Sequence, residues 1–170
     1  MNYNFRKATG IEIPKIWEII QQAIVRRKND ESQQWQDGYP NENVIEQDIA
    51  KGIGYVLTDD ETIVGYTAIL INDEPAYNDL KGNWLTNGDF VVVHRLAISE
   101  EYLGKGLAQK IFLCTEYIAT ENNIFSIKVD TNFDNIPMLK IFEKLGYTYC
   151  GEVSFRGSAR KAFEKELLAD

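Results

Sequence analysis

A glycine-rich turn separates a β-branched run from a helix-forming segment in the second half of this chain. The run Val91–Ile98 favours a strand, and Gly104, Lys105 and Gly106 follow it after a short polar loop. A strand that leads through glycines into a helix N-terminus presents backbone N–H groups and the positive end of the helix dipole, which together bind phosphate. The pattern predicts a site for a phosphate-bearing ligand, and the alternative is a turn that simply begins a helix.

His94 is the chain's one histidine, and it lies within the strand-forming run. Alternation along a strand predicts that it shares a face with Val92, Leu96 and Ile98. An unperturbed imidazole titrates near pH ~6.5 and can accept a proton at neutral pH. His94 is therefore a candidate catalytic base, and a histidine packed and hydrogen-bonded in the sheet is the alternative. Arg95 is expected to form a structural ion pair or to line the site.

The elements that must position these residues follow from hydrophobic periodicity and turn residues. Strands are expected over residues 3–7, 55–58, 63–71, 90–98, 125–129, 147–153 and 162–168, and helices over 13–27, 44–51, 106–122 and 135–145. Asn135 and Gly146 carry the N-cap and C-terminal stop signals of the last helix. Hairpins come first and strand–helix alternation follows, which predicts an α+β fold with a mixed sheet and helices on both faces. The polar connection 72–89 is expected to be functional or mobile.

Composition limits the class of protein. A chain of 170 residues predicts one domain, residues 1–170, and a net charge of −8 argues against a nucleic-acid binder. The same acidity weakly favours a cationic or amine partner. Cys114 and Cys150 lack metal-type spacing and are expected as reduced thiols, so no metal site is predicted. The sequence contains no apolar run long enough to span a membrane and no visible signal peptide, so we expect a cytoplasmic protein with no membrane partner.

Two segments resemble the GNAT superfamily, whose members transfer an acyl group from coenzyme A to an amine. Residues 103–108, Leu-Gly-Lys-Gly-Leu-Ala, are similar to the family's cofactor loop Arg/Gln-x-x-Gly-x-Gly/Ala. Leu103 departs from that pattern, and Lys105 could supply the missing positive charge. Residues 135–147, Asn-Ile-Pro-Met-Leu-Lys-Ile-Phe-Glu-Lys-Leu-Gly-Tyr, resemble the family helix Asn-x-x-Ala-x-x-x-Tyr-Glu-Lys-x-Gly-Phe.

The resemblance implies a GNAT-like fold and an acetyl-CoA or coenzyme A site. The cofactor-binding residues it implies are Leu96, Ala97, Ile98, Leu103, Gly104, Lys105, Gly106, Leu107, Ala108, Asn135, Met138, Phe142 and Lys144. The strand residues would pair with the pantetheine arm through their main chain, and a backbone N–H there would stabilise the developing oxyanion. Phe142 stands where many members carry a tyrosine that protonates the leaving thiolate, so this chain lacks that acid.

The acceptor is less defined. Trp35 and Tyr39 lie in an irregular segment that in this fold commonly walls the acceptor pocket, and loop anchoring is the equal alternative. The resemblance implies an N-acetyltransferase in which a primary amine of a small molecule, or a peptide amine, attacks the acetyl group directly. The departures at Leu103 and Phe142 keep open an acyl-CoA-binding regulatory module without turnover. A homodimer also stays open, because many relatives dimerise through terminal strands.

Overall fold

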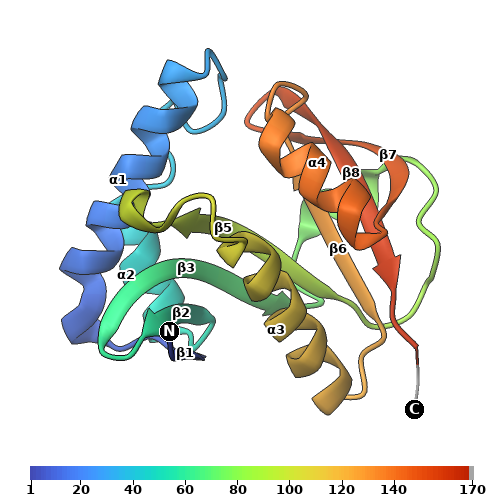
Figure 1. Cartoon of the computed structure of the whole chain (residues 1–170). Coiled ribbons are helices and arrows are strands. Elements are labelled where there is room, and N and C mark those ends of the chain that lie inside the picture. The colour runs from blue at the N-terminus through green and yellow to red at the C-terminus, as the bar shows by residue number, and fades with distance from the viewer. Residues whose placement is uncertain (169–170) are drawn as a thin grey trace. The chain divides into compact units, whose positions relative to one another are not determined.

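The computed structural model describes residues 1–168 of the chain (Figure 1). The chain forms two compact units, one made of Met1–Ile69 and His94–Cys114 and the other of Leu70–Val93 and Thr115–Asp170. The prediction of a single domain over residues 1–170 is not tested by this division and stays a prediction.

The elements follow the predicted order closely. The strands are β1 (Tyr3–Lys7), β2 (Gly54–Asp59), β3 (Thr62–Ile71), β4 (Lys81–Gly82), β5 (Val91–Ile98), β6 (Ser126–Thr131), β7 (Thr148–Phe155) and β8 (Ser158–Glu166). The α-helices are α1 (Ile13–Asn29), α2 (Glu42–Ala50), α3 (Leu107–Glu121) and α4 (Ile136–Leu145), with 3-10 turns η1 (Gly10–Glu12), η2 (Pro75–Asp79) and η3 (Glu100–Tyr102). The strand order is β1-β2-β3-β5-β6-β8-β7-β4. Strands β5 and β6 are parallel and β6 and β8 antiparallel, so the predicted α+β fold with a mixed sheet is confirmed.

Helices cover both faces of the strands in the first unit. The buried residues of α1 recur at helical spacing and pack with residues of α2, β2, β3 and β5; they include Ile16, Ile19, Ile20, Ala23, Ile45, Val56, Tyr66 and Ala97. On the opposite face, a Cβ added at Gly65 of β3 would lie 3.0 Å from Ile98 Cδ1 and 3.1 Å from Ile111 Cδ1 of α3. Glycine at this position lets α3 approach the strand closely.

The apolar spacing in the segment that forms α3 predicts a buried stripe of Leu107, Ile111, Cys114 and Ile118, and this prediction is partly wrong. Leu107 and Ile111 are buried as expected, but Cys114 and Ile118 are only half-buried. The other buried positions are Phe112, Thr115 and Ala119. The apolar stripe of a helix is more than 100° wide, so spacing alone did not fix which neighbouring positions face inward.

In the second unit, α4 packs against β8. The two elements lie side by side in Figure 1, and the ring of Phe142 in α4 lies 5.0 Å from the ring of Phe163 in β8, centroid to centroid. The predicted ends of α4 are confirmed: the Asn135 side chain accepts from the Met138 N–H, and Gly146 is left-handed with a φ of 84°. The capping amide and the glycine stop thus fix both ends of the helix.

The connection 72–89 has structure that the periodicity did not reveal. It contains η2 and the two-residue strand β4, which pairs with Glu152 and Gly151 of β7. A Cβ added at Gly82 would lie 2.0 Å from the carbonyl oxygen of Cys150, so only glycine permits this pairing. The connection is also anchored by Tyr77, whose hydroxyl donates to Asp130 of β6 at 2.6 Å. A strand of two residues carries no detectable alternation, which is why it was missed.

Strands β7 and β8 extend further than predicted and meet at a hairpin turn. Arg156 and Gly157 form that turn with φ values of 48° and 76°. Among residues 1–168, no helix is long and apolar enough to cross a membrane. No group of three or more metal-ligating side chains occurs in the same part of the chain.

Candidate active site

The glycine loop has the backbone that the sequence predicted. Gly104 and Gly106 are left-handed, with φ values of 77° and 73°. The loop leads directly into α3, where the Lys110 N–H donates to the Gly106 carbonyl at 3.1 Å. The first N–H groups of a helix have no intrahelical acceptor, so those of α3 can donate to an anionic group placed at this end.

The loop also offers the space that a phosphate group needs. A Cβ added at Gly104 or Gly106 would meet nothing within 4 Å, so the glycines are required by their φ and leave an open approach to the backbone. Lys105 is exposed, with its Nζ 5.8 Å from the Tyr102 ring, and Leu103 is 44% exposed. These residues fit an anionic group held mainly by the main chain, with Lys105 as the nearby cation.

The strand before this loop carries an unusual backbone conformation at Arg95. Its φ is 55°, although it is a non-glycine residue inside β5. A left-handed residue with a Cβ costs about 1–2 kcal/mol, so surrounding contacts must hold it. The alternation used to place His94 on the face of Leu96 and Ile98 does not extend through this residue, because the strand is not extended there.

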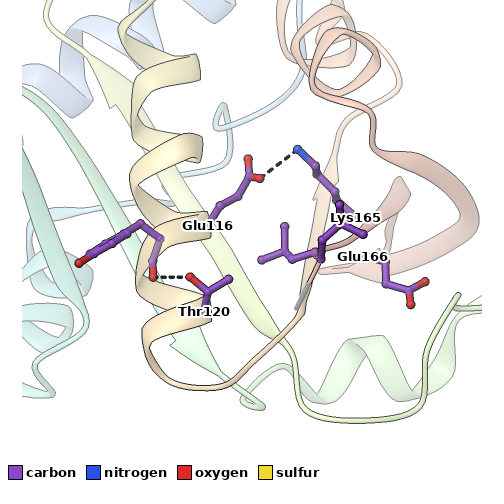
Figure 2. Close-up of a pocket in the computed structure, with 7 residues that line it drawn as sticks. Glu116, Thr120, Lys165 and Glu166 are labelled. Carbon is purple, nitrogen blue, oxygen red and sulfur yellow. Dashed lines mark hydrogen bonds and ion pairs between the residues drawn. The ribbon is translucent and has the colours of Figure 1, made fainter. Parts of the chain in front are cut away.

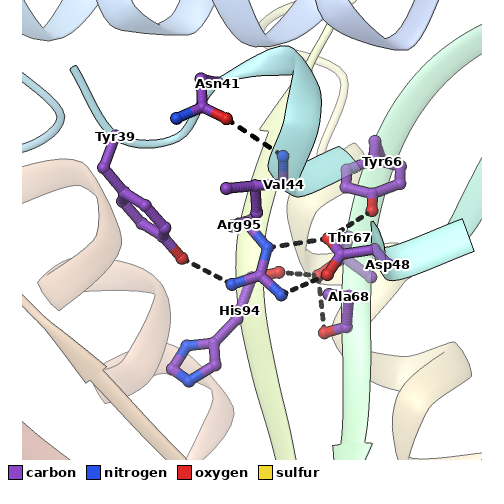
Figure 3. Close-up of polar contacts among 9 residues, drawn as sticks. All are labelled: Tyr39, Asn41, Val44, Asp48, Tyr66, Thr67, Ala68, His94 and Arg95. Carbon is purple, nitrogen blue, oxygen red and sulfur yellow. Dashed lines mark hydrogen bonds and ion pairs between the residues drawn. The ribbon is translucent and has the colours of Figure 1, made fainter. Parts of the chain in front are cut away.

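The side chain of Arg95 forms the structural ion pair that the sequence predicted. Its Nε and Nη2 donate to the two carboxylate oxygens of Asp48 at 2.8 and 2.7 Å, and Nη1 donates to the Tyr39 hydroxyl at 2.5 Å (Figure 3). The Tyr66 hydroxyl donates to Asp48 at 2.7 Å. Burial acts to lower the pKa of Arg95, but the Asp48 and Tyr39 interactions outweigh it and raise that pKa above the ordinary value, so the guanidinium stays charged.

His94 lies beside this cluster and is half-buried. Its backbone carbonyl accepts a hydrogen bond from Thr67 Oγ1 at 2.9 Å, and Figure 3 shows the imidazole directed away from the Asp48 carboxylate. The carbonyl of Ile98, at the other end of this stretch, accepts from Arg26 Nη2 at 2.9 Å. Leu96, Ala97 and Ile98 are themselves buried, so their side chains belong to the core, and binding of a cofactor through their backbone stays a prediction.

Trp35 and Tyr39 both serve as anchors of the segment between α1 and α2. Trp35 is 5% exposed and lies under the guanidinium of Arg27 at 3.8 Å, and burial lowers the pKa of Arg27 to about 10. Tyr39 accepts from Arg95. These contacts favour the loop-anchoring alternative, and a contact of either ring with an acceptor stays a prediction.

Of the remaining predicted cofactor residues, Leu107 and Ala108 begin α3, and the others lie at the N-cap of α4 or on α4, in the second unit. Asn135 is 8% exposed and uses its side-chain oxygen as the helix cap, while Met138 is half-buried. Phe142 is 1% exposed, so its ring is part of the core. Lys144 is exposed, as is Lys140 on the same helix.

Sequence reasoning missed Asp48 and Tyr66. Asp48 is 4% exposed, and it lies in α2 between the apolar residues Ile45 and Ile49. An acidic residue within an apolar helical stripe is a signal of a buried, paired carboxylate. Its partner could not be identified from the sequence, because Arg95 is 47 residues away.

A concave region lies outside these residues. It is lined by Glu116, Tyr117, Thr120, Lys165, Glu166, Leu167 and Leu168, with a volume of about 490 Å³ (Figure 2). Lys165 Nζ and Glu116 Oε1 are 3.0 Å apart across it. None of the predicted cofactor or catalytic residues lines this pocket.

Comparison with known proteins identifies the class. The acetyltransferase (GNAT) family model matches residues 17–147, which is most of the chain. The chain therefore belongs to the GNAT family and is an acetyltransferase of that family, which uses acyl-CoA.

Individual relatives agree with this assignment. A GNAT-family acetyltransferase from Streptococcus agalactiae 2603 is 35% identical, with a TM-score of 0.88, and the match covers 98% of this chain and 96% of that one. The structure of yncA from Salmonella typhimurium, solved with its cofactor acetyl-CoA, has the same fold: TM-score 0.69, 16% identity, 99% and 95% coverage. Streptothricin acetyltransferase of Escherichia coli is 23% identical over 107 residues. That match covers 63% of this chain and 60% of the relative's length.

Proposed function

We propose that this protein transfers an acetyl group from acetyl-CoA to a primary amine of a small molecule. The observation that carries the proposal is the pair of left-handed glycines, Gly104 and Gly106, at the N-terminus of α3, which follow η3 and the strand that holds His94. Two likenesses support the choice of cofactor and acceptor: yncA binds acetyl-CoA, and the matched Escherichia coli enzyme is named for streptothricin.

The cofactor would be held mainly by backbone groups. In this proposal the N–H groups of residues 104–108 and the dipole of α3 bind the pyrophosphate, and Lys105 adds a positive charge. The main chain of Leu96–Ile98 binds the pantetheine arm. The family resemblance also assigns Asn135, Met138, Phe142 and Lys144 to cofactor binding, and that assignment stays a prediction. When bound, acetyl-CoA supplies a thioester that an amine can attack directly.

The chain's own residues would then control protons and charge. His94 accepts a proton from the acceptor amine, directly or through water. A backbone N–H of Leu96–Ile98 donates to the oxygen that becomes negatively charged. Phe142 cannot donate a proton, so either another group protonates the leaving thiolate or the thiolate, whose thiol has an ordinary pKa of about 8.5, leaves without an acid.

The acceptor is proposed to be cationic in solution. The chain has a net charge of −8, and Glu31, Asp37 and Glu42 are exposed around the segment that holds Trp35 and Tyr39. Like charge would disfavour an acidic acceptor, whereas an amine would be attracted. We place the reaction in the cytoplasm, in keeping with two cysteines that form no disulfide in the described structure. The oligomeric state is left to measurement.

Release of coenzyme A thiol tests the proposal. Purified protein is incubated with acetyl-CoA and separate panels of small amines, peptides with free N-termini and lysine peptides, and a thiol reagent follows turnover. A blank without acetyl-CoA corrects for Cys114 and Cys150. Turnover with small amines and a product heavier by one acetyl group are expected. Turnover with peptides alone would mean that the acceptor is a peptide amine and not a small molecule. Coenzyme A binding without turnover on any panel would instead support the regulatory module.

A further inference from the structure

Arg95 is singular in its backbone conformation. Within residues 1–168, seven non-glycine residues have a positive φ, and Arg95 is the one that lies inside a strand. The others lie in turns, bends or loops, where a left-handed residue simply reverses the chain. A left-handed residue inside a strand instead redirects the peptide groups that follow it. In β5 those groups belong to Leu96 and Ala97.

Three hydrogen bonds to two partners hold the side chain of Arg95. Asp48 of α2 accepts two hydrogen bonds, at 2.8 and 2.7 Å, and Tyr39 accepts a third at 2.5 Å (Figure 3). A guanidinium bound in this bidentate manner has a fixed plane as well as a fixed position. The orientation of Arg95 is therefore set by α2 and by the segment that precedes it.

Asp48 is fixed in turn by Tyr66 of β3. The Tyr66 hydroxyl donates to Asp48 Oδ2 at 2.7 Å, and neither residue is more than 4% exposed. A Cβ added at Gly54 would lie 3.0 Å from the same hydroxyl, so glycine at this position leaves the space that the tyrosine occupies. The carboxylate thus has one arrangement, between a packed helix and a packed strand.

The backbone around Arg95 is fastened at both ends as well. Thr67 Oγ1 donates to the His94 carbonyl at 2.9 Å, and Arg26 Nη2 donates to the Ile98 carbonyl at 2.9 Å. The Ser99 N–H donates to the Val64 carbonyl at 2.8 Å. Between these fixed points, the left-handed turn at Arg95 decides where the amides of Leu96 and Ala97 point.

We propose that Asp48, Tyr66 and Tyr39 are positioning residues for acyl transfer: through Arg95 they maintain the left-handed backbone of β5, and thereby set the direction of His94 and of the Leu96–Ile98 amides. This inference rests on the proposed function, because a positioning role for these residues requires that β5 takes part in acyl transfer. Buried ion pairs often contribute less to stability than apolar residues of equal volume would. We therefore explain the bidentate Asp48–Arg95 pair by the left-handed conformation that it imposes on Arg95, and not by its contribution to stability.

Tyr39 gives the cluster a second consequence. It lies in the segment between α1 and α2 that also holds Trp35, and its bond to Arg95 joins this segment to β5. An acceptor that fixes the position of residues 30–41 would therefore also restrain β5, the strand that carries His94. Loss of the Tyr39 hydroxyl should weaken this link without removing the buried Asp48–Arg95 pair.

The experiment compares substitutions in the cluster with one in a matched pair elsewhere. Asp48→Asn, Tyr66→Phe and Tyr39→Phe change the cluster by one or two atoms each. Glu12→Gln is the control, because Glu12 also binds an arginine in bidentate manner, Arg6, at 3.0 and 2.7 Å. For each protein we measure kcat, KM for acetyl-CoA, thermal midpoint, and the backbone amide NMR signals of Leu96, Ala97 and Ile98.

Asp48→Asn should lower kcat about 10²-fold while KM for acetyl-CoA changes less than about 3-fold, since misplacement affects the reacting geometry most. Tyr66→Phe and Tyr39→Phe should lower kcat by about 3- to 10-fold with a near-native thermal midpoint, which keeps the test valid if Asp48→Asn does not fold. The amide signals of Leu96 and Ala97 should shift in all three cluster variants and stay in place in Glu12→Gln. The proposal would be overturned if kcat fell only in proportion to the decrease in thermal midpoint, and did so to the same extent in the cluster variants and in Glu12→Gln.

The two proposals can fail separately. If wild-type protein turns over no amine, the proposed function fails, yet the amide signals still report whether the cluster sets the backbone of β5. If wild-type protein is active but those signals are unchanged in Asp48→Asn and Tyr66→Phe, the positioning role is wrong and the proposed function stands.

Discussion

Phe142 of α4 packs against Phe163 of β8 with ring centroids 5.0 Å apart and ring planes tilted by 51°. A further ring, that of Tyr147, lies 5.5 Å from Phe142. The position at which many relatives carry a tyrosine hydroxyl is thus occupied here by a core ring that is 1% exposed. The departure seen in the sequence is part of an aromatic cluster.

A tyrosine hydroxyl at position 142 should not act as an acid for the leaving thiolate. Phe142→Tyr is expected to lower the free energy of unfolding by about 1–3 kcal/mol, because a hydroxyl would enter a packed apolar cluster, and to leave kcat no higher. Urea unfolding and steady-state kinetics measure the two effects. Phe133→Tyr, at a ring that is 45% exposed, is the control and should change neither. A higher kcat in Phe142→Tyr at unchanged stability would instead show that the hydroxyl reaches the leaving thiol.

A carboxylate at Gly106 should abolish coenzyme A binding. Gly106→Glu places negative charge where the proposed pyrophosphate site needs N–H donors, so affinity should fall by about 10²-fold or more. Calorimetric titration with coenzyme A measures it. Gly157→Glu is the matched control: Gly157 also has a left-handed φ, 76°, and open space around it. Equal affinity of the two variants would remove residues 104–106 from the cofactor site.

His94→Ala should lower kcat by roughly 10²-fold or more if His94 is the base. A base works only when deprotonated, so activity of the wild-type protein should fall at low pH, and this limb of the profile should disappear in the variant. His94→Gln keeps hydrogen-bonding capacity without a titrating ring. Recovery of activity in the glutamine variant would indicate a packing role, and an unchanged pH profile in His94→Ala would exclude the base assignment.

Acid should remove one stabilising pair in the first unit. The hydrogen bonds from Arg6, with those from Thr9, lower the pKa of Glu12 from 4.5 to about 2 despite its partial burial. A carboxyl whose folded pKa is lowered stabilises the protein above about pH 4.5, and this contribution is lost as the pH falls toward 2. The Arg6 side chain is 40% exposed, so solvent screening limits the effect to about 1 kcal/mol.

Urea unfolding of wild-type protein and Glu12→Gln at several pH values measures this contribution. The stability difference between them should be present at neutral pH and should shrink as the pH falls from about 4.5 to 2. An equal difference at both ends of this range would mean that the ion pair does not carry the pH dependence.

Glu164 of β8 should hold the 72–89 connection in place. Its buried carboxylate accepts from the Leu85 N–H at 2.8 Å, from Thr86 Oγ1 at 2.5 Å and from Ser126 Oγ at 2.7 Å. Glu164→Gln should lower the free energy of unfolding by about 1.5–3 kcal/mol and speed hydrogen exchange at the Leu85 and Thr86 amides. Glu166→Gln, at an exposed position of the same strand, should do neither. Unchanged exchange in Glu164→Gln would mean that other contacts anchor the connection.

Local signals in the sequence were sufficient for most of the fold. Repeating apolar positions specified α1, and the Asn135 and Gly146 signals specified both ends of α4. These features depend on residues within a few positions of each other, so periodicity and capping report them directly. The strand β4 and the full extent of the β7–β8 hairpin depend on pairing between strands, and alternation alone reported neither.

The sequence by itself determined the family, the strand–loop–helix order around Gly104–Gly106, and the two departures at Leu103 and Phe142. It also indicated that Arg95 would either form a structural ion pair or line the site. Only the tertiary structure decided that Asp48 is the partner, that Tyr66 and Tyr39 complete the cluster, and that Arg95 is left-handed within β5. The physical reason is distance along the chain: these contacts join residues between 18 and 56 positions apart, and such pairs form only when packing brings α2, β3 and β5 together.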